Sequence, residues 1–319
     1  MDAVVVGELN ADLILSGLAA IPNYGELQLA QGMRLTLGSS SAIFACNLAR
    51  LGLSVGFVGK VGNDMVGSFL VERLESSGVD TSRIVRTEGA QTGICVILSF
   101  SHDYAMASYP GVRESFCLDD VDFDYVQSGK HMHMSSFYLQ PGLRPGAAEL
   151  FRRAKAAGLT TSLDPDHDPS GKWDGGLREL LPSVDVFLPN EQEALKISGT
   201  KDIESALDTL NRLAVSVVIK RGAAGVVTRS RGKTLAVPGF RIEPLDTTGA
   251  GDSFNAGFIS RFLNRDSLAQ CVVWGNACGA MSTLVMGGIE GFPTRRRVEE
   301  FFDERAEELG KMLEAFQPA

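Results

Sequence analysis

The chain of 319 residues is 44% hydrophobic and 22% charged, a composition typical of a globular protein with a sizeable buried core. A net charge of −9 without a long basic stretch argues against a nucleic-acid partner, and no apolar run reaches the length needed to cross a bilayer. The five cysteines are scattered without CxxC spacing and no secretory signal is evident, so a protein of the reducing cytoplasm is expected.

The first part of the chain is expected to combine strands with two helices. Residues 3–7 are mostly β-branched, which is typical of a short buried strand. Residues 38–51 predict a helix that ends at Gly52, and Asp64 is expected to cap a second helix. Further strands are expected at residues 53–58, 92–100 and 104–109, the last two forming a hairpin across Ser101, His102 and Asp103.

Strand and helix patterns alternate after residue 130. Helical stretches such as residues 145–157 separate four strand candidates, at residues 130–134, 160–164, 184–188 and 215–220. This order predicts an α/β fold with a doubly wound, mostly parallel sheet, whose ligands bind beyond the carboxyl ends of the strands. Asp164 and Asp166 fall at such an end.

The most informative stretch is DTTGAGDSFNAGF, residues 246–258. Three small residues, Gly249, Ala250 and Gly251, precede a segment in which phenylalanines recur at helical spacing. A tight turn at the start of a helix presents unpaired N–H groups and the positive end of the helix dipole, which predicts a site for an anion such as phosphate. Asp252 could cap this helix, or it could act as a base toward an attacking hydroxyl while the amides hold a phosphoryl group.

This stretch resembles the C-terminal signature of the ribokinase family of sugar and nucleoside kinases, also called the PfkB family. The resemblance covers nearly the whole chain and implies one ribokinase-like kinase domain over residues 1–319. It also implies a small β-sheet lid built from residues 10–37 and 90–112, which often pairs two subunits, so a homodimer is expected. In this family Asp252 would be the catalytic base, and the anion hole would consist of Gly249, Ala250 and Gly251.

The resemblance also assigns an acceptor site. Asn10 and Asp12 follow the first strand, where the family holds sugar hydroxyls, and the two oxygens of a carboxylate suit vicinal hydroxyls. The match around Gly38 is partial, because Ser39 replaces the usual second glycine and Ile43 stands where an asparagine is expected. The acceptor residues implied in this way are Asn10, Asp12, Gly38, Ser39, Ser40 and Asp166.

Other elements resemble the nucleotide and metal sites of the family. Asn190 and Glu193 match an Asn-x-x-Glu element that organises magnesium and the ATP phosphates, and Lys220 could face the phosphates as a point charge. The nucleotide loop and the adenine contact would be Gly222, Gly225 and Asn276. Asp246 and Thr248, together with Glu193, match metal-binding positions, which implies ATP, Mg²⁺ and a monovalent cation, K⁺, as cofactors.

The expected function is therefore ATP-dependent phosphorylation of a hydroxyl on a small neutral sugar. An anionic acceptor is disfavoured because Ser40 stands where ribokinases have lysine, and because Asp166 and Asp168 would repel a carboxylate. A nucleoside is the alternative acceptor, and a non-catalytic sugar or nucleotide sensor on the same fold is the alternative function.

Two other enzyme classes fit less well. Ser253, within Gly-Asp-Ser, matches the core of lipase-like esterases, but the last histidine, His167, lies upstream of the serine rather than downstream of it. The segment 232–234 (Gly-Lys-Thr) has the ending of a P-loop, but Val227 stands where that motif requires glycine.

Overall fold

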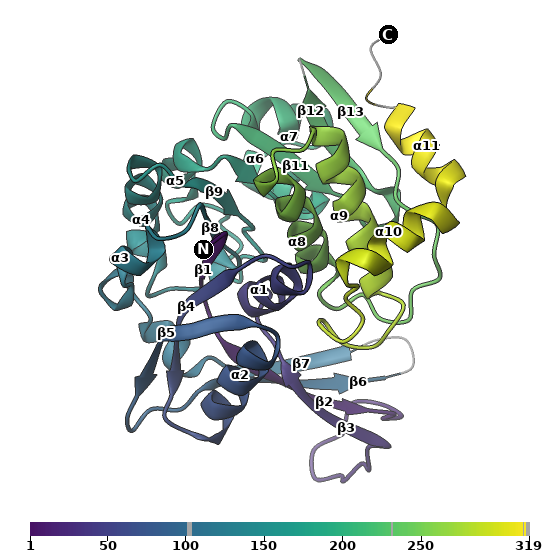
Figure 1. Cartoon of the computed structure of the whole chain (residues 1–319). Helices are drawn as coiled ribbons and strands as arrows, with labels where there is room; N and C mark the ends of the chain where they lie inside the picture. The colour runs from purple at the N-terminus through teal and green to yellow at the C-terminus, as the bar shows by residue number, and fades with distance from the viewer. Residues whose placement is uncertain (101–103, 231, 315, 317–319) are drawn as a thin grey trace.

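The computed structural model describes residues 1–100, 104–230, 232–314 and 316, which form a large α/β body with a smaller sheet at its lower end (Figure 1). The large sheet has the strand order β13-β12-β11-β10-β9-β8-β1-β4-β5. Its strands are β1 (Ala3–Val6), β4 (Val55–Gly62), β5 (Val79–Thr87), β8 (His131–Met134), β9 (Thr160–Leu163), β10 (Val186–Phe187), β11 (Ser216–Lys220), β12 (Val226–Ser230) and β13 (Lys233–Val237).

In this spatial order, neighbouring strands pair in parallel from β5 at one edge as far as β11. At the other edge, β12 and β13 are added by antiparallel pairing. Each face of the sheet has its own hydrophobic core. In β1, Ala3 and Val5 belong to one core and Val4 and Val6 to the other, as the two-residue period of a strand requires. The predicted doubly wound α/β architecture is thus confirmed.

Helices cover both faces of the large sheet. One face is covered by α1 (Ser40–Arg50), α2 (Met65–Ser76), α8 (Ala250–Leu263), α9 (Leu268–Ser282), α10 (Arg295–Glu304) and α11 (Ala306–Glu314). The other face is covered by α3 (Phe123–Val126), α4 (Arg144–Ala156), α5 (Leu177–Leu180), α6 (Glu191–Ser198) and α7 (Ile203–Leu210). No described helix has the length and apolar character needed to span a membrane.

The small sheet has the order β3-β2-β6-β7. Its strands are β2 (Asn10–Ser16), β3 (Gly32–Leu37), β6 (Gly93–Ser99) and β7 (Tyr104–Tyr109). β2 and β6 run parallel, and the two outer pairs are antiparallel. The expected β6–β7 pairing is therefore present, whereas its turn, residues 101–103, lies outside the described residues.

The strand β4 extends well beyond its predicted end. β4 continues to Gly62 instead of ending at residue 58, because β5 pairs with it as far as Gly62 opposite Thr87. A Cβ at Gly59 would lie 2.8 Å from the carbonyl oxygen of Gly7, and a Cβ at Gly62 would lie 2.3 Å from that of Ala90. In the sequence these glycines look like part of a turn. In the structure they lie in a strand and allow neighbouring backbone to pass close to it.

Candidate active site

A cavity of about 900 Å³ opens at the carboxyl ends of the parallel strands, where doubly wound sheets bind their ligands. Its walls come from segments far apart in the chain, including the ends of β9 and β11, the starts of α6 and α8, and β7 of the small sheet. The predicted site residues that line it are Ser40, Asp166, Asn190, Glu193, Lys220, Gly222, Gly225, Gly249, Ala250, Gly251, Asp252 and Asn276.

The turn before α8 has the geometry expected of an anion site. Gly249 caps the helix with φ 70°, and a Cβ there would lie 2.9 Å from Cα of Gly288. The N–H of Ala250 donates to the carbonyl of Thr247 at 3.2 Å, so this amide is already used. Within the described part of the chain, the N–H groups of Gly251 and Asp252 have no acceptor and remain available to a ligand.

Ile43 supports this turn from α1. Its side chain lies against two glycines, since a Cβ built at Gly249 would be 3.4 Å from Ile43 Cγ2 and one at Gly288 would be 2.8 Å from Cδ1. Ile43 is 5% exposed and belongs to the hydrophobic core. The residue that replaces the expected asparagine therefore packs behind the turn instead of lining the cavity.

Asp252 lies in the first turn of α8 and is 8% exposed. Burial raises the pKa of its carboxyl well above the usual range, and the charges of Asp164, Asp166 and Glu8 raise it further, whereas Lys220 opposes them. Such an environment disfavours the ionised form, so the carboxylate is a stronger base toward a hydroxyl proton than an exposed aspartate.

Lys220 is held beneath the turn by a buried ion pair. Its Nζ lies 2.5 Å from Asp164 Oδ2 and 3.3 Å from Asn255 Oδ1, and Asn255 Nδ2 donates to the same Asp164 oxygen at 2.5 Å. Burial opposes the lysine charge, but Asp164 and Glu193 together raise its pKa, so the amine stays protonated. The roles of Asp164 and Asn255 were missed in the sequence, although Asn255 stands three residues after Asp252 on the same helix face.

Asn190 and Glu193 form the N-terminal capping box of α6. The N–H of Asn190 donates to Glu193 Oε2 at 2.7 Å, and the N–H of Glu193 donates to Asn190 Oδ1 at 2.9 Å. Burial, followed by the charge of Asp164, raises the pKa of Glu193 to about 8.

These residues fit a magnesium ion that is bound mainly through the nucleotide. The described chain contains no cluster of three or more His, Cys, Asp or Glu residues that could hold a metal alone. The charge of Asp164 nevertheless disfavours the ionised form of Glu193, and a cation beside Glu193 would favour that form. Mg²⁺ commonly takes few protein ligands and keeps phosphate oxygens and waters.

Three residues that were predicted to bind the nucleotide also line the cavity. Asn276, on α9, is 7% exposed and donates from Nδ2 to the carbonyl of Pro238 at 3.0 Å. Gly225 has φ 81°, and a Cβ there would meet the carbonyl of Val237, so glycine is required. Gly222 begins the short 3-10 turn at residues 222–224, which brings backbone to the cavity wall.

Asp246 lies outside the cavity and joins two loops. Its Oδ1 accepts the N–H of Thr248, and its Oδ2 accepts the N–H of Gly287, both at 2.9 Å. These bonds connect the segment before α8 to the loop after α9. The carboxylate therefore stiffens the approach to the turn at Gly249.

Asn10, Asp12 and Gly38 meet where the small sheet joins the body. Asn10 Nδ2 donates to Asp12 Oδ1 at 3.1 Å, and the N–H of Gly38 donates to the carbonyl of Asn10 at 3.0 Å. A Cβ at Gly38 would meet Asp12 Oδ1, so a side chain is excluded there. Burial raises the pKa of Asp12 to about 6, although the charge of Arg113 lowers it.

Backbone strain concentrates beside Asp166. Ser39, Ser136 and Asp166 are non-glycine residues with positive φ, at 72°, 53° and 58°. Such residues cost about 1–3 kcal/mol each and tend to gather at functional sites. Asp166 Oδ2 accepts from Ser136 Oγ at 2.9 Å and from Ser40 Oγ at 3.4 Å, which fixes this carboxyl at the cavity.

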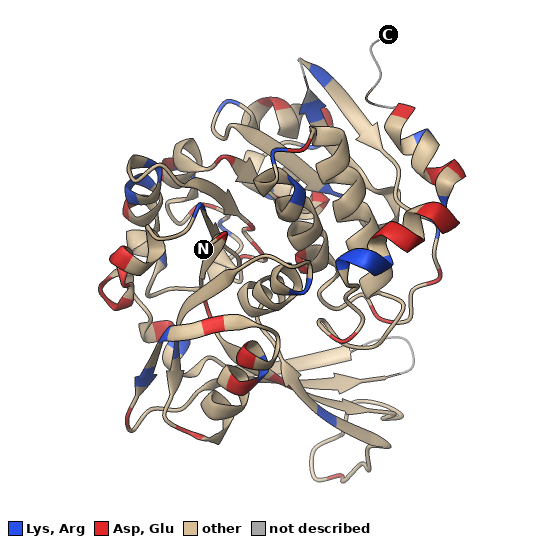
Figure 2. Cartoon of the chain, viewed as in Figure 1, with Lys and Arg blue, Asp and Glu red and all other residues tan. Residues whose placement is uncertain are grey.

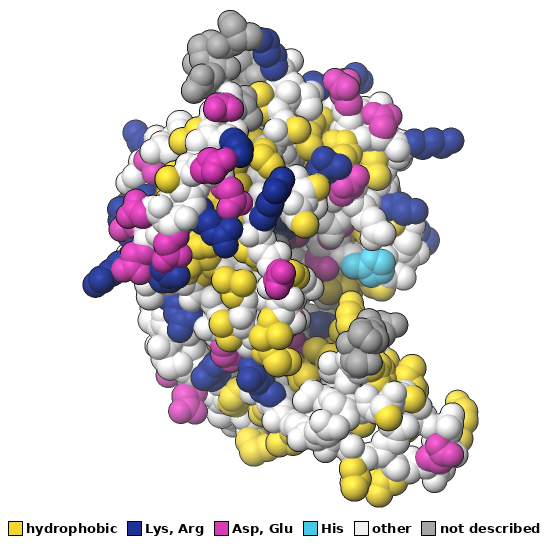
Figure 3. Space-filling model, turned by 90° about the vertical axis from the view of Figure 1, so that its right-hand side faces the viewer, with side chains coloured by type: hydrophobic (Ala, Val, Ile, Leu, Met, Phe, Trp, Pro, Cys, Tyr) yellow, Lys and Arg dark blue, Asp and Glu magenta, His cyan; other side chains and the backbone are white. Residues whose placement is uncertain are grey.

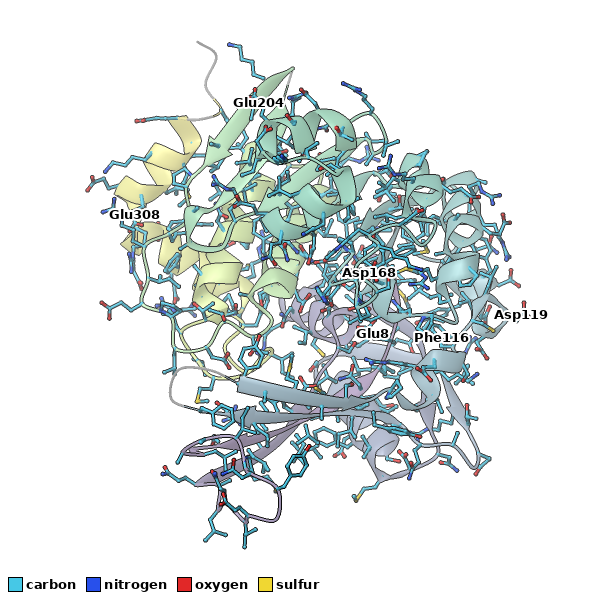
Figure 4. The ribbon with its side chains drawn as sticks, turned by 180° about the vertical axis from the view of Figure 1, so that it is seen from behind. Glu8, Phe116, Asp119, Asp168, Glu204 and Glu308 are labelled. Carbon is cyan, nitrogen blue, oxygen red and sulfur yellow. The ribbon has the colours of Figure 1, made fainter. Side chains whose placement is uncertain are left out.

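Glu8 is a buried acid that the sequence reasoning missed. It is 2% exposed, where the two sheets meet (Figure 4), and its Oε2 accepts from Ser41 Oγ at 2.7 Å. Ser39 Oγ donates to the carbonyl of Glu8 at 2.6 Å and accepts the N–H of Ala42 at 3.2 Å, which offsets the strain at Ser39. The sequence feature that could have identified Glu8 as a site residue is its position two residues before Asn10.

Asp168, which was expected to repel an anionic acceptor, binds backbone N–H groups of its own loop and does not line the cavity. Its carboxylate accepts the N–H of Ser170 at 2.9 Å and that of Trp173 at 2.6 Å, and it is buried (Figure 4). These bonds shape the loop after β9, and Asp168 does not line the cavity. Repulsion of an anionic acceptor therefore depends on other carboxyl groups.

Residues 1–295 match the pfkB family of carbohydrate kinases, and the chain belongs to this family. It is 31% identical over 301 residues to the ATP-dependent ribose-1-phosphate kinase of Halopiger xanaduensis, covering 94% of this chain and 97% of the relative. It is 29% identical over 314 residues to the 2-dehydro-3-deoxygluconokinase of Bacillus subtilis, covering 94% and 95%.

Solved structures share the fold. The ribokinase of Thermotoga maritima superimposes with a TM-score of 0.83 at 25% identity, over 95% of this chain and 99% of that one. The ribokinase of Arabidopsis thaliana in complex with ribose and ATP superimposes with a TM-score of 0.81 at 25% identity, over 94% and 97%. The ribokinase-like fold predicted from the sequence is thus confirmed, and the chain is a carbohydrate kinase.

Proposed function

We propose that this protein transfers the γ-phosphoryl group of ATP to a hydroxyl of a small neutral sugar, with Asp252 as the general base. The observation that carries the proposal is the placement of this buried carboxyl beside the free N–H groups of Gly251 and Asp252, in one cavity with Lys220. A base and an anion site side by side suit attack of a hydroxyl on a phosphate.

Each part of the cavity has a role in this mechanism. Asp252 takes the proton from the attacking hydroxyl, and the free N–H groups at the start of α8 stabilise charge on the moving phosphoryl group. Lys220, oriented by Asp164 and Asn255, adds a positive charge below the turn. Asn190 and Glu193 would hold a magnesium ion on the ATP phosphates, and that ion would supply positive charge there. Asn276, Gly222 and Gly225 shape the nucleotide wall.

The charge of the acceptor side favours a neutral sugar. The names of the relatives indicate a neutral acceptor for ribokinase, an acidic one for 2-dehydro-3-deoxygluconokinase and a phosphorylated one for ribose-1-phosphate kinase. In this chain the charges of Glu8 and Asp166 already act on Asp252, and Lys220 is paired with Asp164. An anionic acceptor would add charge to a region that is already rich in carboxyl groups.

A coupled assay with ATP and Mg²⁺ tests the proposal. The acceptors are ribose, 2-dehydro-3-deoxygluconate, ribose 1-phosphate and a nucleoside, compared by kcat/KM. We expect a neutral sugar to exceed both anionic acceptors at least tenfold. A nucleoside as the best acceptor would favour the alternative kinase, and absence of transfer to any of them, with ATP bound, would favour a sensor.

We also propose that a monovalent cation such as K⁺ binds beside Asp246. The carboxylate joins Thr248 and Gly287 through their N–H groups, so a cation bound to it would sit where the two loops are already connected. An ion there would stiffen the segment before α8 without touching the acceptor.

We further propose that two copies of the chain pair through the small sheet. β6 and β7 carry no charged residue (Figure 2), and hydrophobic side chains gather on the projecting sheet (Figure 3). Met33 is 72% exposed and Tyr109 50% exposed. Light scattering should show a dimer that Met33→Glu dissociates, whereas Met65→Glu, at an equally exposed position on α2, should leave it intact.

The cysteines support the proposal of a reducing, cytoplasmic environment. All five are unpaired, and Cys46, Cys271 and Cys278 are buried. Burial raises the pKa of the Cys46 thiol to about 11 and that of Cys271 to about 12, so neither is a reactive thiolate.

A further inference from the structure

The loop between α9 and α10, residues 283–294, connects the small sheet to the body of the protein (Figure 1). Arg34 Nη1 on β3 donates to the carbonyl of Met286 at 3.0 Å, and Thr36 Oγ1 donates to Glu290 Oε1 at 3.4 Å. Arg34 and Thr36 are two residues apart on one strand, so both project from the same face of the small sheet. That face is therefore fastened to the loop at two points.

Glu290 links the small sheet to the body through one carboxylate oxygen. Its Oε1, which accepts from Thr36, also lies 3.3 Å from Arg73 Nη2 on α2. Its Oε2 lies against Gly287, since a Cβ built on that glycine would collide with it, and the same Cβ would lie 3.2 Å from Arg34 Nη1. The backbone of Gly287, with φ 104°, is therefore in close contact with both charged groups.

The same loop supports the anion turn at the start of α8. The N–H of Gly287 donates to Asp246 Oδ2 at 2.9 Å, and Asp246 Oδ1 accepts the N–H of Thr248 at 2.9 Å. A Cβ at Gly249 would lie 2.9 Å from Cα of Gly288, so the turn and the loop pack backbone against backbone. A displacement of the loop would therefore move the turn that presents the free N–H groups.

The other end of this path adjoins a predicted acceptor residue. Asp12 on β2 lies opposite Thr36 on β3, and paired residues of neighbouring strands project from the same face of a sheet. Contacts thus run without a gap from the strand that carries Asp12, through Thr36 and Glu290, to Gly287 and the turn.

We propose that Glu290 is a positioning residue that couples the two substrate sites, so that an acceptor bound on the small sheet strengthens nucleotide binding at the start of α8. This inference rests on the proposed function, because it takes Asp12 as an acceptor ligand and the turn at Gly249 as a phosphate site. An acceptor that fixes β2 and β3 removes part of the freedom of the loop and of the turn, so a nucleotide that binds afterwards loses less entropy. The coupling is reciprocal, so the nucleotide raises the affinity for the acceptor by the same factor.

Calorimetric titration of the full-length protein at fixed Mg²⁺ and K⁺ concentrations tests the coupling. The probe is AMP-PNP, an ATP analogue that cannot donate its γ-phosphoryl group, titrated without and with saturating ribose or 2-dehydro-3-deoxygluconate. In the wild type we expect the sugar to lower the Kd of AMP-PNP at least about fivefold. Glu290→Ala should reduce this factor below about twofold while the Kd without sugar stays within about twofold of the wild type, a result that neither unfolding nor loss of a direct ligand would give.

Three variants show whether the link itself is responsible. Thr36→Val removes the hydroxyl that reaches Glu290 and keeps a β-branched side chain in the strand, so it should also abolish the coupling. Glu290→Gln retains an oxygen that can accept from Thr36 and should keep most of the coupling. Glu299→Ala breaks a surface ion pair with Arg295 on α10 and should leave the coupling unchanged.

Hydrogen–deuterium exchange of the ligand-free protein tests the same path without an acceptor. Peptides that cover residues 246–253 should exchange faster in Glu290→Ala and in Thr36→Val than in the wild type or in Glu299→Ala. Thr36 lies on the small sheet, so its effect on this turn requires transmission through the loop.

Several outcomes overturn the inference. A wild type without coupling, an unchanged coupling factor in Glu290→Ala, or unchanged exchange of residues 246–253 would refute the link. A loss in Glu290→Gln as large as in Glu290→Ala would show that the bond to Thr36 does not carry it. If neither sugar binds, the acceptor site is refuted and the exchange measurement alone decides the link. Transfer by the wild type without coupling refutes only the link, whereas coupling without transfer refutes only the kinase mechanism.

Discussion

Replacing Asp252 with asparagine should stop phosphoryl transfer without unfolding the protein. Asparagine keeps the size of the side chain, and the helix cap at Gly249 is not altered, but asparagine cannot accept the hydroxyl proton. Loss of a general base typically costs about 10²–10⁴ in rate, which corresponds to about 3–5 kcal/mol of activation free energy. Removing a negative charge beside the anion site should leave ATP binding intact or improve it.

The same substitution should raise stability, and more so at higher pH. Burial raises the pKa of Asp252 in the folded protein, so this carboxyl favours folding where it is protonated, and that contribution is lost as the pH rises through its folded pKa. Each unit of raised pKa corresponds to about 1.4 kcal/mol. Because asparagine does not titrate, the Tm of the variant minus that of the wild type should increase from pH 5 to pH 8.

Ser253→Ala is the matched control, because Ser253 adjoins Asp252 but faces the core. Its Oγ accepts from Asn47 Nδ2 at 3.1 Å, and both residues are fully buried. Loss of the hydroxyl leaves a buried amide unpaired and should cost about 1–3 kcal/mol of stability, with little effect on rate. Single-turnover transfer, ATP titration and thermal unfolding of both variants distinguish a kinase that uses Asp252 as base from an esterase that uses Ser253 as nucleophile. Near-normal transfer by Asp252→Asn would refute the mechanism, and loss of transfer in a stable Ser253→Ala would favour esterase-like chemistry.

Three further predictions concern the acceptor, the cation and the buried lysine. Asp12→Ala should weaken acceptor binding by about 1.5–3 kcal/mol and leave ATP binding unchanged, and equal weakening of both in titrations would contradict the assignment. The rate should rise in K⁺ relative to tetramethylammonium, and Asp246→Ala should abolish that difference; equal rates in the two salts would argue against the cation. Lys220→Met leaves Asp164 without its partner and should lower the free energy of unfolding by about 3–5 kcal/mol, so unchanged urea unfolding would show that the pair is not buried as described.

The fold was predictable because its signals are local. The alternation of strands and helices, the β-branched run of β1 and the glycine that ends α1 are all properties of neighbouring residues. The end of β4 was predicted wrongly because it depends on a strand that is distant in the chain. Gly59 and Gly62 look like a turn, and only pairing with β5 makes them part of a strand.

The chemistry of the site was predictable for the same reason where it resides in one segment. Gly249 and the proposed base Asp252 lie three residues apart in the chain, and so do the capping partners Asn190 and Glu193. Ala250 is an exception. It was predicted to offer its N–H to an anion, but that N–H donates to the carbonyl of Thr247 within the turn, and the residue types alone do not reveal this bond.

The sequence by itself determined the class of fold and the family, and it predicted the position of the proposed base, because each depends on residues close together in the chain. Tertiary structure alone decided which distant side chains act on that base and on the acceptor. Asp164 meets Lys220 and Asn255 across three separate elements, Glu8 meets Ser41, and Asp168 binds the N–H of Trp173 instead of lining the cavity. Charges act through space, so the pKa of a buried carboxyl depends on how strands and helices pack, which no local pattern records.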